Sequence, residues 1–132
     1  MTKTKMNKSK AKGTRAETAV VRYLLDHGIQ AERRALSGNE DKGDVKFWNK
    51  EGNPRILEVK AGKQTQNPNR TQLEEWLRQA RVEEFNSGML CALCVVRYNR
   101  KLRDADVYVQ YKLSNTIVRE HMYLDEFVEQ MV

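Results

Sequence analysis

The stretch that decides the fold is residues 44–60, which read DVKFWNKEGNPRILEVK. Val45 to Trp48 and Arg55 to Lys60 are short, β-prone runs, and Asn49 to Pro54 between them are turn formers. Two strand-like runs joined by such a turn predict a β-hairpin.

This hairpin is predicted to carry two acids and a lysine on one face. Side chains alternate across a strand, so Glu58 and Lys60 project together, while Leu57 and Val59 mark the opposite face as the core side. Asp44 begins the partner strand, and the alternation of side chains along that strand places it on the same face as Glu58. At about 4 Å and an effective dielectric near 20, two carboxylates repel each other by roughly 4 kcal/mol, so the pair needs a proton or a cation.

The chemistry that suits such a pair is phosphodiester hydrolysis. Carboxylate oxygens with room for water favour Mg²⁺, with Mn²⁺ as a substitute. Such an ion polarises a phosphoryl oxygen, and the ammonium of Lys60 orients the attacking water or stabilises the added charge. An exposed salt bridge between Glu58 and Lys60, common in hairpins, remains the alternative.

Working outward, helical and alternating patterns predict one mixed β-sheet flanked by helices, an α/β fold in the order helix, three strands, helix, two strands, helix. Capping boxes at Thr14/Glu17 and Thr71/Glu74 begin the first two helices. The second helix is expected to bury one face formed by Leu73, Trp76, Leu77, Ala80 and Phe85. The other predicted elements are a first helix over about 15–27, strands over 29–36, 89–98 and 106–111, and a last helix over 124–131.

The longest apolar stretch, Met89 to Val96, is far below the roughly 18 to 20 residues that span a bilayer. The basic N-terminus lacks the apolar segment of a secretory signal, so we expect no membrane contact and a cytoplasmic location, in the host cell if the chain is phage-encoded. Cys91 and Cys94 lie in an apolar run without a second pair to complete a zinc site, which predicts ordinary core cysteines. His27 and His121 have no obvious partners and are assigned no role.

The sequence resembles the PD-(D/E)XK nuclease superfamily, and within it the archaeal-type and phage Holliday junction resolvases. The resemblance runs from Gly13 to about Tyr98. Its motifs are Gly13-Thr14-Arg15-Ala16-Glu17, Arg33-Arg34 followed by Ser37-Gly38, Gly43-Asp44-Val45, Glu58-Val59-Lys60, and Gln72 in the second helix. Gly43 stands where the family has a proline, a departure that removes no ligand.

This resemblance implies a restriction-endonuclease-like core and assigns the site. It implies that Asp44, Glu58 and the backbone carbonyl of Val59 bind the metal, and that Lys60 assists the attacking water. It also implies that Glu17 completes the acidic site, directly or through water. A capping role explains Glu17 as well, and both interpretations stay open.

Charge predicts where DNA binds. The formal charge of +6 equals the six basic residues that precede the first acid, because the remaining 18 basic and 18 acidic residues cancel. Residues 1–13 are therefore expected to be a flexible basic arm, and residues 14–132 a single nuclease domain. The predicted DNA-binding residues are Lys8, Lys10, Lys12, Arg15, Arg33, Arg34, Ser37, Lys63, Arg70 and Gln72. None belongs to a module that reads base sequence.

The function expected from the sequence is a Mg²⁺-dependent DNA endonuclease of recombination or repair, selective for branched DNA and resembling a Holliday junction resolvase. A homodimer is expected because two symmetric cuts need two sites related by a two-fold axis. Two alternatives remain open: an exonuclease or flap and fork nuclease with the same chemistry, and an inert nuclease-like module that only binds DNA.

Overall fold

The computed structural model describes residues 15–34, 44–62 and 65–132. Within them the chain forms one sheet of six strands in the order β1-β2-β3-β4-β5-β6. Neighbouring strands are antiparallel except for β3 and β4, which are parallel. The strands are β1 (Ala31–Arg33), β2 (Asp44–Trp48), β3 (Pro54–Lys60), β4 (Cys91–Val95), β5 (Asp106–Leu113) and β6 (Thr116–Tyr123).

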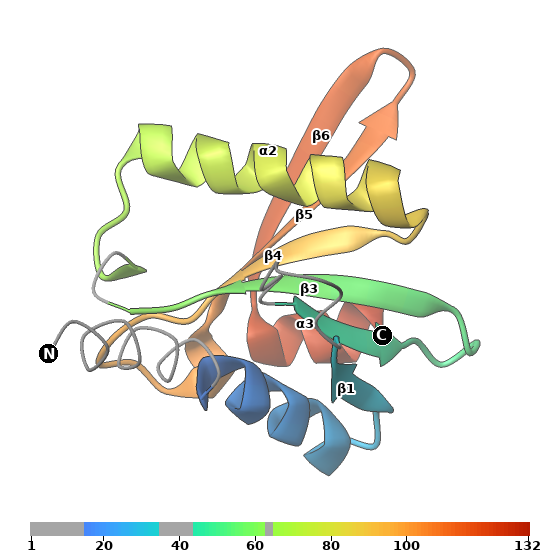
Figure 1. Cartoon of the computed structure of the whole chain (residues 1–132), viewed down its shortest axis with the longest axis vertical. Helices are drawn as coiled ribbons and strands as arrows, with labels where there is room; N and C mark the ends of the chain where they lie inside the picture. The colour runs from blue at the N-terminus through green and yellow to red at the C-terminus, as the bar shows by residue number, and fades with distance from the viewer. Residues whose placement is uncertain (1–14, 35–43, 63–64) are drawn as a thin grey trace, which may run out of the picture.

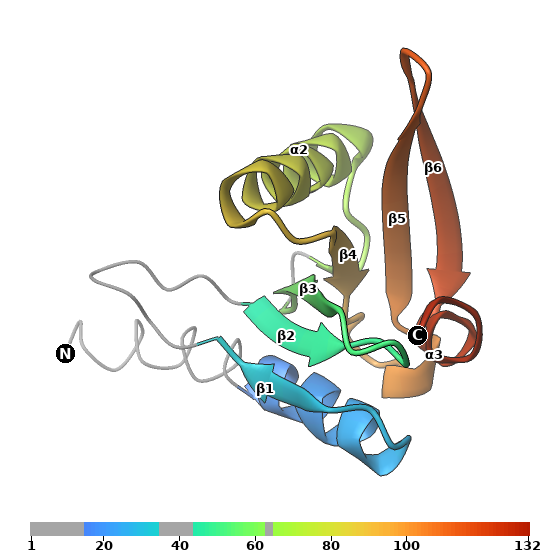
Figure 2. The ribbon, with the colours of Figure 1, turned by 90° about the vertical axis from the view of Figure 1, so that its right-hand side faces the viewer.

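Helices cover both faces of this sheet (Figures 1 and 2). Helix α2 (Arg70–Ser87) lies on one face, where Trp76 and Leu77 pack on Leu93 and Val95 of β4. The N-terminal helix, helical over residues 15–26, and α3 (Leu124–Met131) lie on the other face. The main core lies there and contains Val20, Leu24, Val45, Leu57, Cys94, Val107, Leu124 and Phe127. A short 3₁₀ helix, η2 (Leu102–Asp104), precedes β5. The predicted α/β class, a single mixed sheet flanked by helices, is confirmed.

The predicted hairpin is confirmed as β2 and β3. Their antiparallel register pairs Asp44 with Glu58 and Val45 with Leu57, so the two acids share one face as expected from their parity. Val45 and Leu57 are fully buried on the other face, against the N-terminal helix and α3. The predicted limits of the last helix, residues 124–131, agree with α3.

The prediction of two strands after α2 was wrong, because β6 makes a third. This strand pairs with β5 along its whole length, yet only Met122 among its side chains is buried. An edge strand with charges along it shows little apolar alternation. Its turn, Ser114–Asn115, also contains no glycine, although Ser114 adopts a φ of 56°, so the usual hairpin signal is missing.

Two predictions about α2 were also wrong. The helix is capped by Asn69, whose side chain accepts a hydrogen bond from the Gln72 backbone N–H at 2.8 Å, and not by Thr71. Phe85, expected in the core, is 89% exposed, because the turn of the helix places it away from the face formed by Trp76, Leu77 and Ala80. Trp76, Leu77 and Ala80 are buried as predicted.

The first and fourth strands are shorter than their predicted ranges of 29–36 and 89–98. Residues 35 and 36 lie outside the described residues, as do Thr14 of the first capping box and the whole predicted arm. Cys91 and Cys94 are free and buried in β4, as predicted for core cysteines. No helix in the described parts of the chain combines the length and the apolar character needed to cross a membrane.

Candidate active site

The centre of the site is the pair formed by Asp44 and Glu58 on the α2 face of the sheet. The Asn49 N–H donates to the Asn53 carbonyl at 3.0 Å, which makes the odd-numbered residues of β2 the hydrogen-bonded positions toward β3. Asp44 and Glu58 therefore form a non-hydrogen-bonded pair. Side chains of such pairs approach each other more closely than those of hydrogen-bonded pairs. The hairpin therefore holds two acidic side chains close together, and no hydrogen bond joins them.

Both acids are buried, with 3% of Asp44 and 8% of Glu58 exposed. Burial, together with the negative charges of Glu58 and Glu83, raises the pKa of Asp44 from 3.8 to about 7, and Arg34 opposes this rise. Burial also raises the pKa of Glu58, against the opposing effect of Lys60. The fold therefore holds both carboxyl groups where a negative charge is unfavourable unless a cation accompanies it.

Lys60 supplies one nearby positive charge. Its Nζ lies 3.4 Å from Glu58 Oε1, and three quarters of its side chain is buried, because 24% is exposed. The predicted shared face of Glu58 and Lys60 is confirmed. The alternative of an ordinary exposed salt bridge does not describe this pair, because the carboxylate of Glu58 lies inside the protein.

Each acid also has one oxygen without a partner. Asp44 Oδ1 and Glu58 Oε2 are buried and accept no hydrogen bond within the described residues. A buried acceptor that is left unsatisfied costs about 1 to 3 kcal/mol, and more when it is charged. Two such oxygens from directly paired residues suit a bound cation.

A divalent metal fits this donor set. No three His, Cys, Asp or Glu side chains of the described residues are grouped so that they could hold an ion by themselves. Mg²⁺, however, keeps several waters and is commonly bound by one or two carboxylates together with substrate phosphates. Asp44 and Glu58 meet that requirement, whereas a closed structural metal centre would need more protein ligands.

Arg34 and Glu83 add further polar contacts to the pair of acids. Arg34, directly after β1, places its Nη1 3.1 Å from Asp44 Oδ2, and the same nitrogen contacts Glu83 Oε1 of α2. Arg34 was predicted from the sequence as a DNA-binding residue, but Glu83 was missed. One signal for Glu83 was present: Glu83 and Glu84 lie near the C-terminal end of a helix, where the macrodipole disfavours acids and where α2 has no basic residue.

Glu17 lies elsewhere. It is 6% exposed and accepts a hydrogen bond from Arg33 Nε at 2.9 Å. Arg33 pairs with Val45, whose side chain packs in the core against the N-terminal helix, so this ion pair lies on the opposite face of the sheet from Asp44. The structure brings Glu17 to Arg33, and a role for Glu17 at the metal stays a prediction.

The other predicted DNA-binding residues are spread over the chain. Arg70 and Gln72 lie in the first turn of α2, and Arg15 is exposed on the N-terminal helix. Lys8, Lys10, Lys12, Ser37 and Lys63 lie outside the described residues. The carbonyl of Val59 as a metal ligand stays a prediction as well.

The sequence also missed a second polar cluster on the same face of the sheet. Asp106 at the start of β5 is 3% exposed, and both of its oxygens have partners. His121 Nε2 lies 2.6 Å from Oδ1, and Arg97 Nε donates to Oδ2. The expectation that His121 has no partner was therefore wrong. The register places Asp106 beside Tyr123 and Tyr108 beside His121, contacts that depend on the strand missed above.

No protein-family model matches the chain, and no curated protein matches it. Among solved structures, the chain is similar to Hjc from Archaeoglobus fulgidus, described as a Holliday junction resolvase from an archaeal hyperthermophile. The TM-score is 0.49 at 16% identity, and the match covers 87% of this chain and 98% of that chain. An identity and a score this low do not transfer chemistry, because one fold can host unrelated activities.

Proposed function

We propose that this protein is a divalent-metal-dependent DNA endonuclease that hydrolyses phosphodiester bonds in branched DNA, in the manner of a Holliday junction resolvase. The main support is the pair of Asp44 and Glu58: two buried acids in direct register, each with one unpartnered oxygen, beside the ammonium of Lys60. A buried pair of this kind is unfavourable for folding and becomes favourable when a cation binds, which is the behaviour of a site built for function.

The residues of the site divide the chemical work. Asp44 and Glu58 would hold Mg²⁺ or Mn²⁺, with the Val59 carbonyl as a further proposed ligand. Glu17, which pairs with Arg33, is proposed to act on the metal through water. When bound, the metal supplies a Lewis acid for the phosphoryl oxygen and lowers the pKa of coordinated water. Lys60, whose Nζ lies 3.4 Å from Glu58 Oε1, places its ammonium beside the two acids, where it would orient the attacking water or stabilise the negative charge that develops on the phosphoryl group.

DNA binding is proposed to extend from this centre. Arg34 lies in the site, Arg70 and Gln72 lie at the N-terminal end of α2, and the basic residues of the first 13 positions add positive charge. These contacts go to phosphates, so they select the shape of the DNA and not its sequence. Two symmetric cuts at a junction would require a homodimer with a two-fold axis.

A cleavage panel tests the proposal. Four-way junction, fork, flap, linear duplex and single-stranded DNA are each incubated with Mg²⁺ or Mn²⁺, and the products are mapped on sequencing gels. Symmetric nicks confined to the four-way junction would support a resolvase, whereas ladders from free ends would show an exonuclease. Products from the fork and flap alone would show a flap or fork nuclease. Absence of any metal-dependent product would leave a module that only binds DNA.

The proposed arm is tested separately by removal of residues 1–12. This segment contains Lys3, Lys5, Lys8, Lys10 and Lys12. Each lost phosphate contact should reduce the slope of log affinity against log salt by about 0.9. An unchanged slope in fluorescence anisotropy would show that the arm does not bind DNA.

A further inference from the structure

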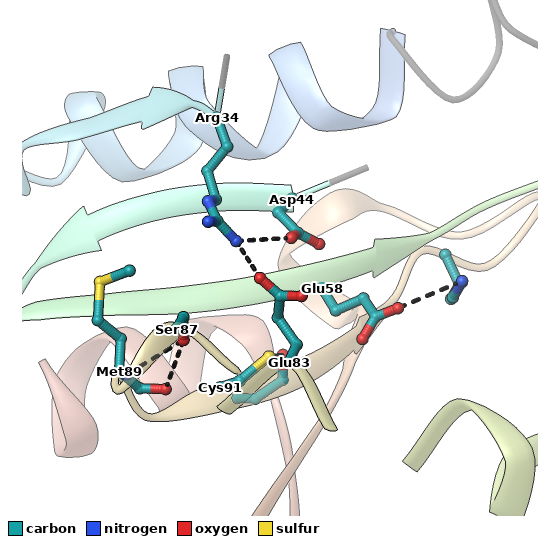
Figure 3. A network of polar contacts seen from close by, with 9 residues as sticks. Arg34, Asp44, Glu58, Glu83, Ser87, Met89 and Cys91 are labelled. Atoms are coloured by element: carbon teal, nitrogen blue, oxygen red, sulfur yellow. Dashed lines mark hydrogen bonds and ion pairs between the residues drawn. The ribbon is translucent and has the colours of Figure 1, made fainter. Parts of the chain in front are cut away.

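Arg34 joins three elements at the site, and it does so through one nitrogen. Nη1 lies 3.1 Å from Asp44 Oδ2 on β2 and contacts Glu83 Oε1 on α2 (Figure 3). The backbone N–H of Arg34 donates to the Asp44 carbonyl at 3.1 Å, so its main chain is fixed beside β2 as well. Both ends of this side chain are therefore held in place.

The rest of the guanidinium is available for another partner. An arginine has five N–H donors, of which Nη1 carries two and Nε and Nη2 carry three. In the parts of the chain that the structure describes, neither Nε nor Nη2 of Arg34 makes a hydrogen bond, and 20% of the side chain is exposed. The Nε–Nη2 edge presents two parallel N–H groups, which can bind a phosphate by two hydrogen bonds.

A negative charge at Glu83 is unfavourable for the helix itself and for the neighbouring acids. Glu83 lies near the C-terminal end of α2, where the helix macrodipole disfavours a negative charge, and its charge also raises the pKa values of Asp44 and Glu58. Its one favourable contact within the described residues is with Arg34. By contrast, the neighbouring Glu84 accepts a hydrogen bond from the Cys91 backbone N–H at 3.0 Å, which joins α2 to β4.

We propose that Glu83 is a positioning residue: with Asp44 it anchors Nη1 of Arg34, so that the Nε–Nη2 edge is presented to a DNA phosphate next to the Asp44–Glu58 pair. This inference rests on the proposed function, because the phosphate belongs to the DNA that is cut. In this arrangement Glu83 itself contacts neither substrate nor metal, and it acts only through Arg34. The site thereby gains a fixed phosphate clamp that bridges the sheet and the helix.

The test is a double-mutant cycle of Arg34→Lys and Glu83→Gln. Lysine keeps the positive charge between the two acids but lacks the planar fork, so a merely structural ion pair would survive this change. Glu75→Gln is the matched control, because Glu75 is an exposed acid of the same helix that pairs with Arg78. The readouts are kcat and KM for junction cleavage with Mg²⁺, the Kd for the same labelled junction in EDTA, and the urea midpoint.

If the proposal is correct, Arg34→Lys and Glu83→Gln each lower kcat/KM and weaken junction binding in EDTA by about 10-fold, and the double variant is no worse than Arg34→Lys alone. Glu75→Gln should stay within about twofold of wild type on both measures. Glu83→Asp, which keeps the charge on a shorter side chain, should recover part of the loss. The urea midpoint of Arg34→Lys should remain that of the wild type.

Either of two outcomes would overturn the proposal. One is wild-type binding and cleavage by Arg34→Lys, which would mean that the fork is not used. The other is an equal loss from Glu83→Gln in both backgrounds, which would mean that Glu83 acts independently of Arg34. Failure of the proposed function is distinguishable, because it removes cleavage from the wild type itself while the EDTA binding cycle still tests the contact between Arg34 and phosphate.

Discussion

Two buried aspartates on the same face of the sheet differ in how many of their carboxylate oxygens have a partner. Asp44 and Asp106 are each 3% exposed, and each begins a strand. Asp106 has a partner on both oxygens, Arg97 and His121. Among the residues that the structure describes, Asp44 is bound by Arg34 on Oδ2 alone, and its Oδ1 has no partner. The two side chains are equally buried, so the difference between them is whether the protein itself supplies partners for the carboxylate.

This difference separates structural from functional burial. A fully partnered buried carboxylate holds its neighbours in place, because removal of one member leaves the others unpaired. A partly partnered one beside a second acid lowers stability until a ligand arrives. Asp44, next to Glu58, belongs to the second kind. Substitution of Asp44 should therefore lower activity and not stability, whereas substitution of Asp106 should lower stability and not activity.

The largest expected effect is on cleavage. Asp44→Asn and Glu58→Gln should each lower kcat by about 1000-fold or more, because a neutral amide cannot replace a carboxylate ligand. Junction binding in EDTA should stay within a few-fold of wild type for Glu58→Gln, whereas Asp44→Asn should also weaken it, because Asp44 is one of the two anchors of Arg34. Stability should be equal to or above that of wild type, since each change removes a buried charge. Unchanged cleavage in either variant, measured at saturating Mg²⁺, would refute the proposed site.

Asp106→Asn should reverse this pattern. The change leaves Arg97 without its carboxylate, so we expect the free energy of unfolding to fall by about 2 to 3 kcal/mol. Cleavage per folded molecule should persist at temperatures well below the unfolding midpoint. Urea unfolding followed by circular dichroism measures the first quantity. A variant as stable as wild type would remove the distinction between the two aspartates.

The sequence predicted the position of Asp44, the aspartate for which we propose a function, and missed the contacts of Asp106. Strand alternation alone places Asp44 opposite Glu58, because the register of a short hairpin is set by its turn and by the buried side of each strand. The contact of Asp106 with His121 needs β6, whose mostly exposed side chains show little alternation. The alternation of residues along the sequence therefore located the acids of the hairpin. It could not locate the cluster around Asp106, because the pairing of β5 with β6 brings those residues together.

Glu83 shows a second limit. Helical periodicity predicts that α2 is a helix and that Trp76 and Leu77 face the core, but it cannot say which acid of the helix lies above Asp44. That depends on where α2 crosses the sheet, which is fixed by tertiary packing on β4. The error at Phe85 has a different origin, because helix geometry itself places Phe85 away from the face of Trp76, Leu77 and Ala80.

The pH dependence of stability should also distinguish the two aspartates. Burial raises the pKa of Asp44 from 3.8 to about 7, so between these values the folded protein binds a proton that the unfolded chain has lost. Asp44 therefore makes the free energy of unfolding fall as the pH rises from about 4 to about 7, by up to roughly 1.4 kcal/mol per pH unit. Urea midpoints in EDTA across this range should show that slope reduced in Asp44→Asn and kept in Asp106→Asn. Equal slopes in wild type and Asp44→Asn would contradict the raised pKa.

The smallest expected effect concerns which partner stabilises Asp106. The side chain of His121 is 42% exposed, against 21% for Arg97, so water weakens its interaction with the carboxylate more strongly. His121→Gln should therefore lower the free energy of unfolding by less than about 1 kcal/mol, the usual limit for an exposed pair. Arg97→Gln should lower it more, because Arg97 also donates to the Gln66 carbonyl at 3.2 Å and so joins the segment before α2 to β5. If His121→Gln is the more destabilising change in urea unfolding, His121 is the main partner of Asp106, and the ring contact with Tyr108 at 5.0 Å is part of what stabilises that end of the sheet.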